Sequence, residues 1–312
     1  MSTILQVENL TKSFGNKRVV DDISFSVPRG DILGFLGPNG AGKTTSLRII
    51  MGILKADRGR VSFFFNEQPS ALDKRRVGYL PEEKGLYEEA RVLPNLTYIG
   101  VLKGMPPSEA RSRAQEWLER VDLQEYASQK FDKLSRGMKQ KVQFIASVLH
   151  EPEVLVLDEP FAGLDPINQE FFLGIITELQ QKGITILFSA HQMNMVEEIC
   201  DSIVLINKGK QVLSGNLKEI KESYKEYNVS LYFEPGNDPS FLWEDPRVVV
   251  NKKGEDYLHL SFQGENDINQ LINSITARLT LKEFQVATPP LHDIFINAVK
   301  ERGEEVEEHQ PA

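Results

Sequence analysis

The feature that most constrains the fold of this chain is the loop GPNGAGKTT at residues 37–45. It follows the apolar run DILGFL and precedes the helix pattern SLRIIMGIL. A strand, a glycine-rich loop and a helix in this order are typical of a phosphate-binding P-loop in an α/β protein. The glycines let backbone amides point into one concavity around a phosphate, and the helix start adds the positive end of its dipole. The sequence therefore predicts a buried strand, a phosphate-binding loop and a helix at 43–53.

The polar residues of this loop have expected roles toward a nucleoside triphosphate. We expect Lys43 to reach the β- and γ-phosphates, the Thr44 hydroxyl to ligate Mg²⁺, and Thr45 to contact the α-phosphate. The residues predicted to surround the nucleotide are Gly37, Pro38, Asn39, Gly40, Ala41, Gly42, Lys43, Thr44 and Thr45. Kinases, GTPases, helicases and transport ATPases share such a loop, so it does not define the reaction. NKGK at 207–210 lacks the acidic residue that reads guanine, and we interpret 207–209 as a turn.

A pair of acidic residues, Asp158 and Glu159, follows the apolar run in EVLVLDEP at 153–160. Asp158, at the strand end, fits an outer-sphere role toward Mg²⁺. Glu159 can hold and polarise an attacking water, because a strand-end carboxylate beside a P-loop lies within hydrogen-bond reach of that water. The alternative is a pair of ordinary strand-end acids. The apolar run argues against this alternative, because burying a charged carboxylate costs free energy unless it is paired or binds a metal ion.

Short apolar runs alternate with helical patterns as far as residue 215, which predicts an α/β fold. Three runs are too continuously apolar to be half-exposed and predict buried parallel strands: DILGFLG, EVLVLD and ITILFSA. The other predicted strands are ILQVENL, VVDDISFSV, VSFFF, RVGYL and SIVLINKG. Further helices are expected at 107–121, 137–149, 166–182 and 192–200. The proline-containing segment 85–130 resembles a helical insertion.

The pattern changes after residue 220. YNVSLYFE and DYLHLSF alternate with period 2, and a hairpin-like turn is expected at Lys253-Gly254. A helix pattern at 265–277, the strand-like LKEFQVAT and the helix PLHDIFINAVK follow. These elements predict an α+β module of roughly 90 residues, within the usual size range of a domain. The terminal segment ERGEEVEEHQPA is acidic and is expected to be frayed.

The segment FDKLSRGMKQK at 131–141 predicts an unusual helix start. Ser135 is a candidate N-cap, because the apolar residues that follow have helical spacing. Gly137 weakens a first helical turn, and the neighbouring cations oppose the positive end of the helix dipole. The order of residues therefore indicates a role beyond starting a helix.

Composition narrows the classes of function. The net charge of −9 gives no electrostatic support for broad nucleic-acid binding. One cysteine, Cys200, excludes an internal disulfide framework and fits a reducing compartment. The five histidines show no metal-ligand spacing. No apolar run approaches the roughly 20 residues of a membrane helix, and the N-terminus has no signal-peptide pattern. If the protein serves a membrane process, another chain is expected to supply the membrane part.

Five motifs occur in a diagnostic order: GPNGAGKTT, LSRGMKQ, VLVLDEP, AGLDP and SAH. Over about residues 3–217 the chain resembles the nucleotide-binding subunit of an ATP-binding cassette (ABC) transporter. The resemblance implies an α/β P-loop NTPase cassette with a mixed sheet core, an antiparallel β subdomain and a helical insertion at about 85–150. The expected domains are a cassette at 1–218, a small α+β accessory domain at 219–300 and an acidic disordered tail at 301–312.

The resemblance assigns roles to three further residues. Phe14, in TKSFGN, occupies the place of the aromatic that stacks on adenine, with a core phenylalanine as the alternative. Asp165, in AGLDP, matches the loop that couples the two sites of a dimer, and it can also be an N-cap. His191 matches the switch histidine that contacts the γ-phosphate, with an ordinary strand-end histidine as the alternative.

Two positions depart from the family pattern. Glu82 in GYLPEEKGLY stands where the family usually has Gln; a carboxylate can still ligate Mg²⁺ and contact the lytic water. Glu82 or Glu83 is alternatively a solvated loop charge. LSRGM replaces the common Leu-Ser-Gly-Gly-Gln. Ser135 and Gly137, the positions expected to touch phosphate, are kept, and the role of Arg136 stays open.

The resemblance implies an ATPase that uses ATP and Mg²⁺, with Lys43, Glu159 and His191 as the catalytic residues. A second cassette, in a homodimer or heterodimer, would supply the signature loop across each nucleotide. An integral membrane permease would be driven through the insertion, which places the chain in the cytoplasm on the inner face of the membrane.

The end TPPLHDIFINAVKE is similar to ATPase subunits of bacterial ABC-2-type exporters, including sodium-efflux and drug-resistance systems, and favours export. The alternative is a soluble ABC-type ATPase acting on the ribosome or DNA. The single cassette, the absence of sustained heptads and the acidic balance argue against it, so no nucleic-acid partner is expected. A regulator without turnover would need loss of Glu159 or Lys43, and both are present.

Overall fold

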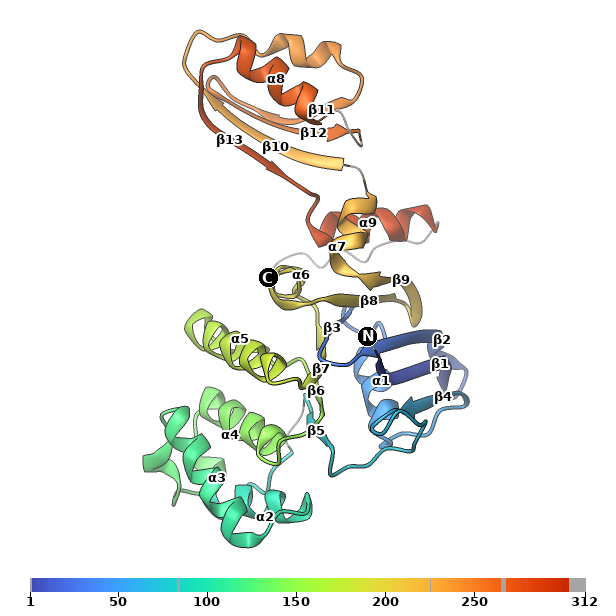
Figure 1. Ribbon diagram of the computed structural model, residues 1–312, viewed down its shortest axis with the longest axis vertical. Helices are drawn as coiled ribbons and strands as arrows, with labels where there is room; N and C mark the ends of the chain where they lie inside the picture. The colour runs from blue at the N-terminus through green and yellow to red at the C-terminus, as the bar shows by residue number, and fades with distance from the viewer. Residues whose placement is uncertain (1, 83–84, 225, 265–267, 303–312) are drawn as a thin grey trace. The chain divides into compact units, whose positions relative to one another are not determined.

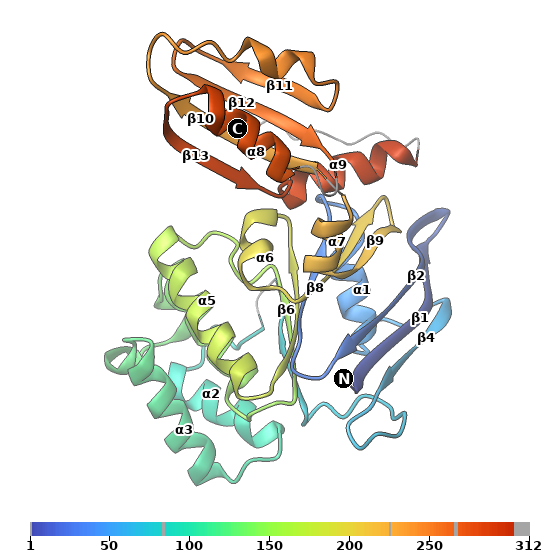
Figure 2. The ribbon, with the colours of Figure 1, turned by 45° about the horizontal axis from the view of Figure 1, so that its top comes forward.

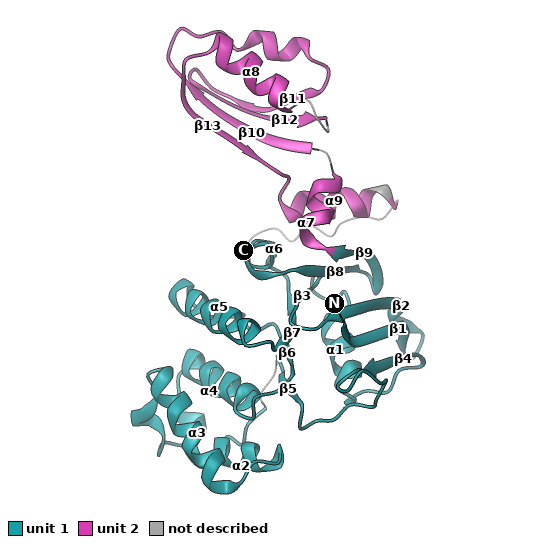
Figure 3. Cartoon of the chain, in the orientation of Figure 1, with its two compact units in different colours: residues 1–215, 309–312 teal, residues 216–308 magenta. Residues whose placement is uncertain are grey.

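The structure is a computed structural model that describes residues 2–82, 85–224, 226–264 and 268–302. The expected disordered tail lies almost entirely outside the described residues, as does Glu83. The chain divides into two compact units, the first reaching Gly215 and the second beginning at Asn216 (Figure 3). Each unit has its own sheet and its own buried core.

The first unit is built on a nine-stranded mixed sheet in the order β4-β1-β2-β9-β8-β3-β7-β6-β5 (Figure 1). The three runs predicted to be buried form β3, β6 and β7, in which every residue is buried and neighbours are parallel. The parallel part comprises β3 (Ile32–Leu36), β5 (Val77–Leu80), β6 (Val154–Asp158), β7 (Thr185–Ala190) and β8 (Ser202–Asn207).

The antiparallel part of this sheet is formed by β1, β2 and β4, with β1 pairing both neighbours. Their bounds are β1 (Thr3–Phe14), β2 (Lys17–Pro28) and β4 (Arg58–Phe63). The strand β9 (Lys210–Asn216) joins the two parts, and its ladder with β2 consists of one parallel pair, Asp21 with Lys210. The sequence did not predict β9, because only Val212 in it is buried.

Helices cover the sheet (Figure 2). The helix after the P-loop, α1 (Lys43–Ile50), contacts β2 and β6, while α5 (Pro166–Gln181) contacts β7 and α6 (Met193–Ile199) contacts β3. Residues 43–53 were predicted as one helix. The observed helix ends earlier, and Gly52, just beyond it, has a left-handed φ of 64° that is typical of a helix end.

The insertion consists of α2 (Val92–Leu102), α3 (Pro107–Arg120) and α4 (Arg136–Val148), with short 3-10 turns at Gln124–Tyr126 and Phe131–Lys133. It has its own apolar cluster, which includes Leu96, Ala114, Leu118, Val142 and Ile145.

Phe144 joins α4 to its neighbours. Its buried ring makes edge contacts with the rings of Trp117 on α3 and Phe172 on α5, with centroid separations of 6.4 and 4.9 Å. We expect Phe144→Ala to lower the free energy of unfolding of the first unit by about 3–5 kcal/mol, because it leaves a cavity between three helices. Urea unfolding followed by the fluorescence of Trp117, in a Trp243→Phe background, measures this.

Phe14→Ala removes the same atoms from a half-exposed ring and is the matched control. The control should change the unfolding midpoint little. Equal losses for the two variants would contradict the assignment of Phe144 to the helical core.

His150, directly after α4, is packed under β5. Its Nε2 lies 3.3 Å from the carbonyl oxygen of Val77, and its Nδ1 is buried with no hydrogen-bond partner among the residues that the structure describes. Burial, helped by the charge of Lys103, lowers the pKa of His150 to about 4. Between that value and the ordinary 6.5 the unfolded chain binds a proton that the folded chain does not, so acidification through this window destabilises the fold.

The free energy of unfolding is therefore expected to fall by up to about 3 kcal/mol as pH drops from 6.5 toward 4. His150→Gln should remove this part of the acid sensitivity, whereas His292→Gln, at an exposed position on α9, should retain it. Denaturant titrations at several pH values test the difference. Parallel pH profiles for wild type and His150→Gln would contradict it.

The second unit has a four-stranded antiparallel sheet in the order β11-β12-β10-β13. The two runs that alternate with period 2 form β10 and β12, as predicted. One face of the sheet is apolar and packs with α8, with Val229, Leu231, Leu260, Leu271 and Ile275 among the buried residues. The strands are β10 (Glu226–Phe233), β11 (Val248–Lys253), β12 (Tyr257–Gln263) and β13 (Leu281–Ala287). The helices are α7 (Leu217–Ser223), α8 (Ile268–Arg278), α9 (Leu291–Glu301) and a 3-10 turn at Ser240–Glu244.

Candidate functional site

The predicted site residues of the P-loop and the acidic pair lie at one edge of the parallel sheet. The P-loop follows β3, Asp158 ends β6, His191 follows β7 and Glu82 follows β5. These four strands are adjacent and parallel, so their carboxyl ends meet at the same edge. Ligands of open α/β sheets bind beyond this edge.

The P-loop surrounds a cavity of about 330 Å³. Its lining comprises Val19, Asn39, Gly40, Gly42, Lys43, Thr44, Thr45, Glu82 and Glu159. The predicted residues Gly37, Pro38 and Ala41 shape the loop instead: the Ala41 side chain is buried, and the carbonyls of Gly37 and Pro38 accept from Lys43 Nζ at 2.8 and 3.3 Å.

The backbone geometry of the loop requires a glycine at position 42. Gly42 has a φ of 104°, and a Cβ at this position would lie 2.5 Å from the carbonyl oxygen of Val19. A side chain here would therefore be strained and would collide with backbone. The cavity owes its shape to this close approach between the loop and β2.

Three oxygen-bearing side chains converge beside Lys43. Thr44 Oγ1 lies 3.2 Å from Glu82 Oε2 and 3.2 Å from Asp158 Oδ1. Asp158 Oδ2 is buried and has no hydrogen-bond partner among the described residues. Burial is the main cause that raises the pKa of Asp158 above its usual value. A buried carboxylate oxygen without a partner, next to a threonine hydroxyl and a second carboxylate, fits a hard divalent cation such as Mg²⁺.

No group of three or more His, Cys, Asp or Glu side chains in the described ranges could hold a metal ion by itself. A cation in this place would therefore use Thr44 and complete its shell with phosphate oxygens and water, as Mg²⁺ usually does in nucleotide sites.

Ser189 is a functional residue that the sequence did not predict. Its Oγ donates to Asp158 Oδ1 at 2.7 Å and accepts from the backbone N–H of Glu159 at 2.9 Å. It is fully buried on β7. One hydroxyl thus orients both members of the acidic pair. The only signal was its place in the SAH motif, which does not show what the serine touches.

Glu159 lies between two cationic or ionisable groups. Its Oε1 is 3.2 Å from Lys43 Nζ, and its Oε2 is 2.9 Å from His191 Nδ1. The backbone of Glu159 has a φ of 50°, a left-handed conformation that non-glycine residues adopt at a cost. The structure thus brings together Lys43, Glu159 and His191, the three residues predicted to be catalytic.

The surroundings of Phe14 and Asp165 bear on the alternatives given for them, a core phenylalanine and a helix N-cap. Phe14 is 50% exposed at the end of β1, so it is not a core phenylalanine, and Lys12 Nζ lies 5.5 Å from its ring centroid. Asp165 caps α5, because its side chain accepts from the backbone N–H of Asn168 at 3.0 Å. This hydrogen bond is the largest cause that lowers the pKa of Asp165. Their roles toward adenine and toward a dimer stay predictions.

The signature residues lie apart from the P-loop cavity. Ser135 is the N-cap of α4, and its Oγ accepts from the backbone N–H of Met138 at 3.3 Å. Neither Ser135 nor Gly137 nor Asp165 is among the residues that line the P-loop cavity. Within one described chain the predicted nucleotide site is thus only partly assembled.

The chain is similar to ATP-binding proteins of ABC transporters over most of its length. Residues 20–162 match the family model described as ABC transporter, and residues 215–299 match the C-terminal domain of DrrA1-3-like ATP-binding proteins. The uncharacterised ABC transporter ATP-binding protein YhaQ of Bacillus subtilis is 38% identical over 296 residues, covering 95% of this chain and 98% of that protein.

Two other matches agree. The linearmycin resistance ATP-binding protein LnrL of Bacillus subtilis is 32% identical over 303 residues, covering 94% of this chain and 97% of that protein. A solved structure of an ATP binding subunit of an ABC transporter superposes with a TM-score of 0.65 at 32% identity, covering 71% of this chain and 93% of the other. This chain therefore belongs to the ATP-binding subunits of ABC transporters, a family that hydrolyses ATP to drive transport.

Proposed function

We propose that this subunit hydrolyses Mg²⁺-bound ATP at the P-loop cavity and so powers export through a separate membrane permease. The observation that carries the proposal is the position of Glu159, held between Lys43 and His191 at the wall of the P-loop cavity. A carboxylate there can accept a proton from a water that attacks the γ-phosphate.

The residues of this chain divide the work of phosphoryl transfer to water. Mg²⁺, when bound, neutralises phosphate charge, and Thr44, Asp158 and Glu82 would hold it. Lys43 changes partners when ATP binds: it leaves the loop carbonyls and Glu159 for the phosphates. Glu159 is thereby released to orient water, and His191 restrains its other oxygen. Ser189 keeps both acids aimed at the cavity.

A second cassette completes the site. Ser135 and Gly137 lie outside the P-loop cavity of their own chain, so they reach a nucleotide only on a partner molecule. The proposed unit is a head-to-tail dimer, formed with another copy or a homologue, in which each signature turn faces the partner's ATP. Phe14 would stack on the adenine of its own site.

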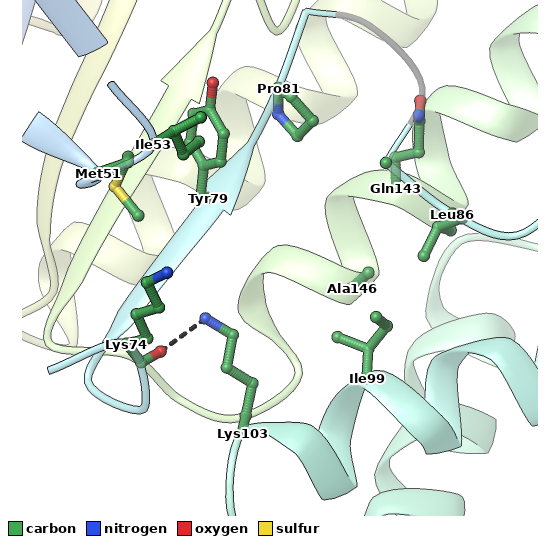
Figure 4. Close-up of a pocket in the computed structure, with 11 residues that line it drawn as sticks. Met51, Ile53, Lys74, Tyr79, Pro81, Leu86, Ile99, Lys103, Gln143 and Ala146 are labelled. Atoms are coloured by element: carbon green, nitrogen blue, oxygen red, sulfur yellow. Dashed lines mark hydrogen bonds between the residues drawn. The ribbon is translucent and has the colours of Figure 1, made fainter. Parts of the chain in front are cut away.

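The permease is proposed to contact the insertion. A mainly apolar groove of about 240 Å³ is lined by residues of β5, α2 and α4 and of neighbouring segments, and Figure 4 shows Tyr79, Leu86, Ile99 and Ala146 around it. On and before α2, the large apolar side chains of Tyr87, Tyr98, Val101 and Leu102 are exposed, and Tyr87 and Tyr98 form an edge-on ring pair. We call these four residues the α2 patch. Exposed apolar surface of this kind marks an interaction site.

None of the helices that the structure describes has both the length and the apolar character needed to span a bilayer. Through the permease the subunit would lie at the inner face of the cell membrane. Export, rather than import, is proposed from the similarity to LnrL, which is named for resistance to linearmycin, and from the DrrA-like second unit, which we propose to be an accessory domain.

Purification from membranes in mild detergent tests the proposal. An integral membrane protein should co-elute with the wild-type chain, and the pair should hydrolyse ATP. The variant Leu102→Glu, in the α2 patch, should lose the membrane partner, whereas Val249→Glu, at a similarly exposed apolar position in the second unit, should keep it. Recovery with ribosomes or DNA in place of a membrane protein would overturn the transporter function.

A further inference from the structure

The guanidinium of Arg136 lies directly against the backbone of Gly163. A Cβ built on Gly163 would be 2.4 Å from both Cζ and Nη2 of Arg136 and 2.7 Å from Nε. The two residues belong to different motifs: Arg136 begins α4 in LSRGM, and Gly163 lies in AGLDP. A side chain at position 163 would force the guanidinium out of this position, and Gly163 also has a left-handed φ of 73°.

A second contact from α4 holds the same loop. Gln140 Nε2 donates to the carbonyl oxygen of Pro160 at 3.0 Å. Arg136 and Gln140 are four residues apart, so they lie on the same face of α4. That face of α4 therefore contacts the loop at Pro160 and at Gly163. The loop begins at Glu159, directly after β6, and ends at Asp165, the N-cap of α5.

Helix stability does not explain an arginine at this position. A cation in the first turn opposes the helix dipole. The Arg136 side chain is exposed. Its guanidinium makes no hydrogen bond or ion pair with the described residues. The guanidinium does lie close to the loop that begins at Glu159, at Gly163.

We propose that Arg136 is a positioning residue for the catalytic carboxylate: its guanidinium clamps the Gly163 turn onto α4 and fixes the loop from Glu159 to Asp165. This inference rests on the proposed function, in which Ser135 and Gly137 contact ATP on a partner. A movement of the signature turn toward that ATP would then be passed through Arg136 to the loop, and so to Glu159 on the other nucleotide.

A double-mutant cycle tests the clamp in the complex of the subunit with its permease. Arg136→Gly removes the guanidinium, and Gly163→Ala displaces it. Each is expected to lower kcat roughly tenfold relative to wild type. The double variant should also be only roughly tenfold slower than wild type, not a hundredfold, because the effects of two residues in one contact do not add. The KM for ATP should be nearly unchanged, since neither residue lines the P-loop cavity.

Gly30→Ala is the matched control. Gly30 has a φ of 75°, close to that of Gly163, but a Cβ there meets nothing within 4 Å. It carries the backbone strain without the contact, and kcat should stay near that of wild type. Arg136→Lys should restore little of the lost rate, because an ammonium does not provide the planar surface of a guanidinium.

Amide hydrogen exchange supplies a readout that does not need hydrolysis. Exchange of residues 161–164 should be faster in Arg136→Gly than in wild type, with thermal melting showing that both are folded. Losses of kcat that multiply in the double variant, or unchanged exchange at 161–164, would overturn the clamp. A wild-type complex without ATPase activity would overturn the proposed function, and the exchange result would still decide the clamp.

Discussion

Glu159→Gln is expected to lower ATP hydrolysis by about 10³-fold, within the range that general bases contribute. An amide has nearly the shape of the carboxylate but accepts no proton from water. ATP binding should survive, because the phosphate contacts proposed for Lys43, Thr44 and Thr45 do not require the Glu159 carboxylate. The ATP-bound dimer should therefore accumulate. Phosphate release and gel filtration with ATP measure the two effects.

Glu170→Gln, at an exposed position on α5, is the control for the same chemical change. It should hydrolyse ATP like wild type and should not be trapped as a dimer. A wild-type rate for Glu159→Gln would show that Glu159 is not the base.

Asp158→Asn is expected to abolish Mg²⁺-dependent hydrolysis while making the nucleotide-free protein more resistant to heat. The two effects have one cause. The buried carboxylate has an oxygen without a partner among the described residues, so its charge costs stability until a cation arrives. A neutral amide avoids that cost, roughly 1–3 kcal/mol for a poorly satisfied buried group. It also offers a poorer ligand to Mg²⁺.

The pH dependence of this gain follows from the raised pKa of Asp158. Because the pKa is higher in the folded state, the ionised form disfavours folding, and its cost grows as pH rises through the folded pKa. The extra melting temperature of Asp158→Asn should therefore be largest near neutral pH and shrink toward pH 4. Thermal melts with and without ATP and Mg²⁺ test both effects.

Asp238→Asn provides a control of opposite sign. The backbone N–H of Ser240 lowers the pKa of the exposed Asp238, so neutralising it removes a favourable contact. An Asp158→Asn protein that melts below wild type and keeps the shift caused by MgATP would contradict the assignment of Asp158 to the cation site.

The sequence predicted the P-loop fold and its buried strands correctly, because their signals are local and strong. Continuous apolar runs fix β3, β6 and β7, and the glycine pattern fixes the loop between β3 and α1. It missed β9, whose place depends on its neighbours in the sheet, and the seven-residue α7, which is too short for a clear period.

Within the candidate site, the sequence predicted the residues that belong to recognisable motifs. It did not predict the contacts that residues of different motifs make with one another. Ser189 is 31 residues from Asp158, and only the pairing of β6 with β7 brings them together. The contact of Arg136 with Gly163 likewise requires α4 to pack beside the loop after β6. Such contacts depend on side-chain positions that no spacing rule contains.

The single ladder pair between β2 and β9 has a mechanical consequence. The antiparallel strands β1, β2 and β4 form one block of the sheet, and β1 ends at Phe14. In the sheet this block is joined to the block of parallel strands by the pair Asp21 and Lys210, where the Asp21 N–H donates to the Gly209 carbonyl at 2.8 Å. Shear between the two blocks meets the least backbone resistance along this seam. Because the P-loop follows β3 in the other block, movement along this seam would change the distance between Phe14 and the P-loop, the two parts proposed to hold the adenine and the phosphates.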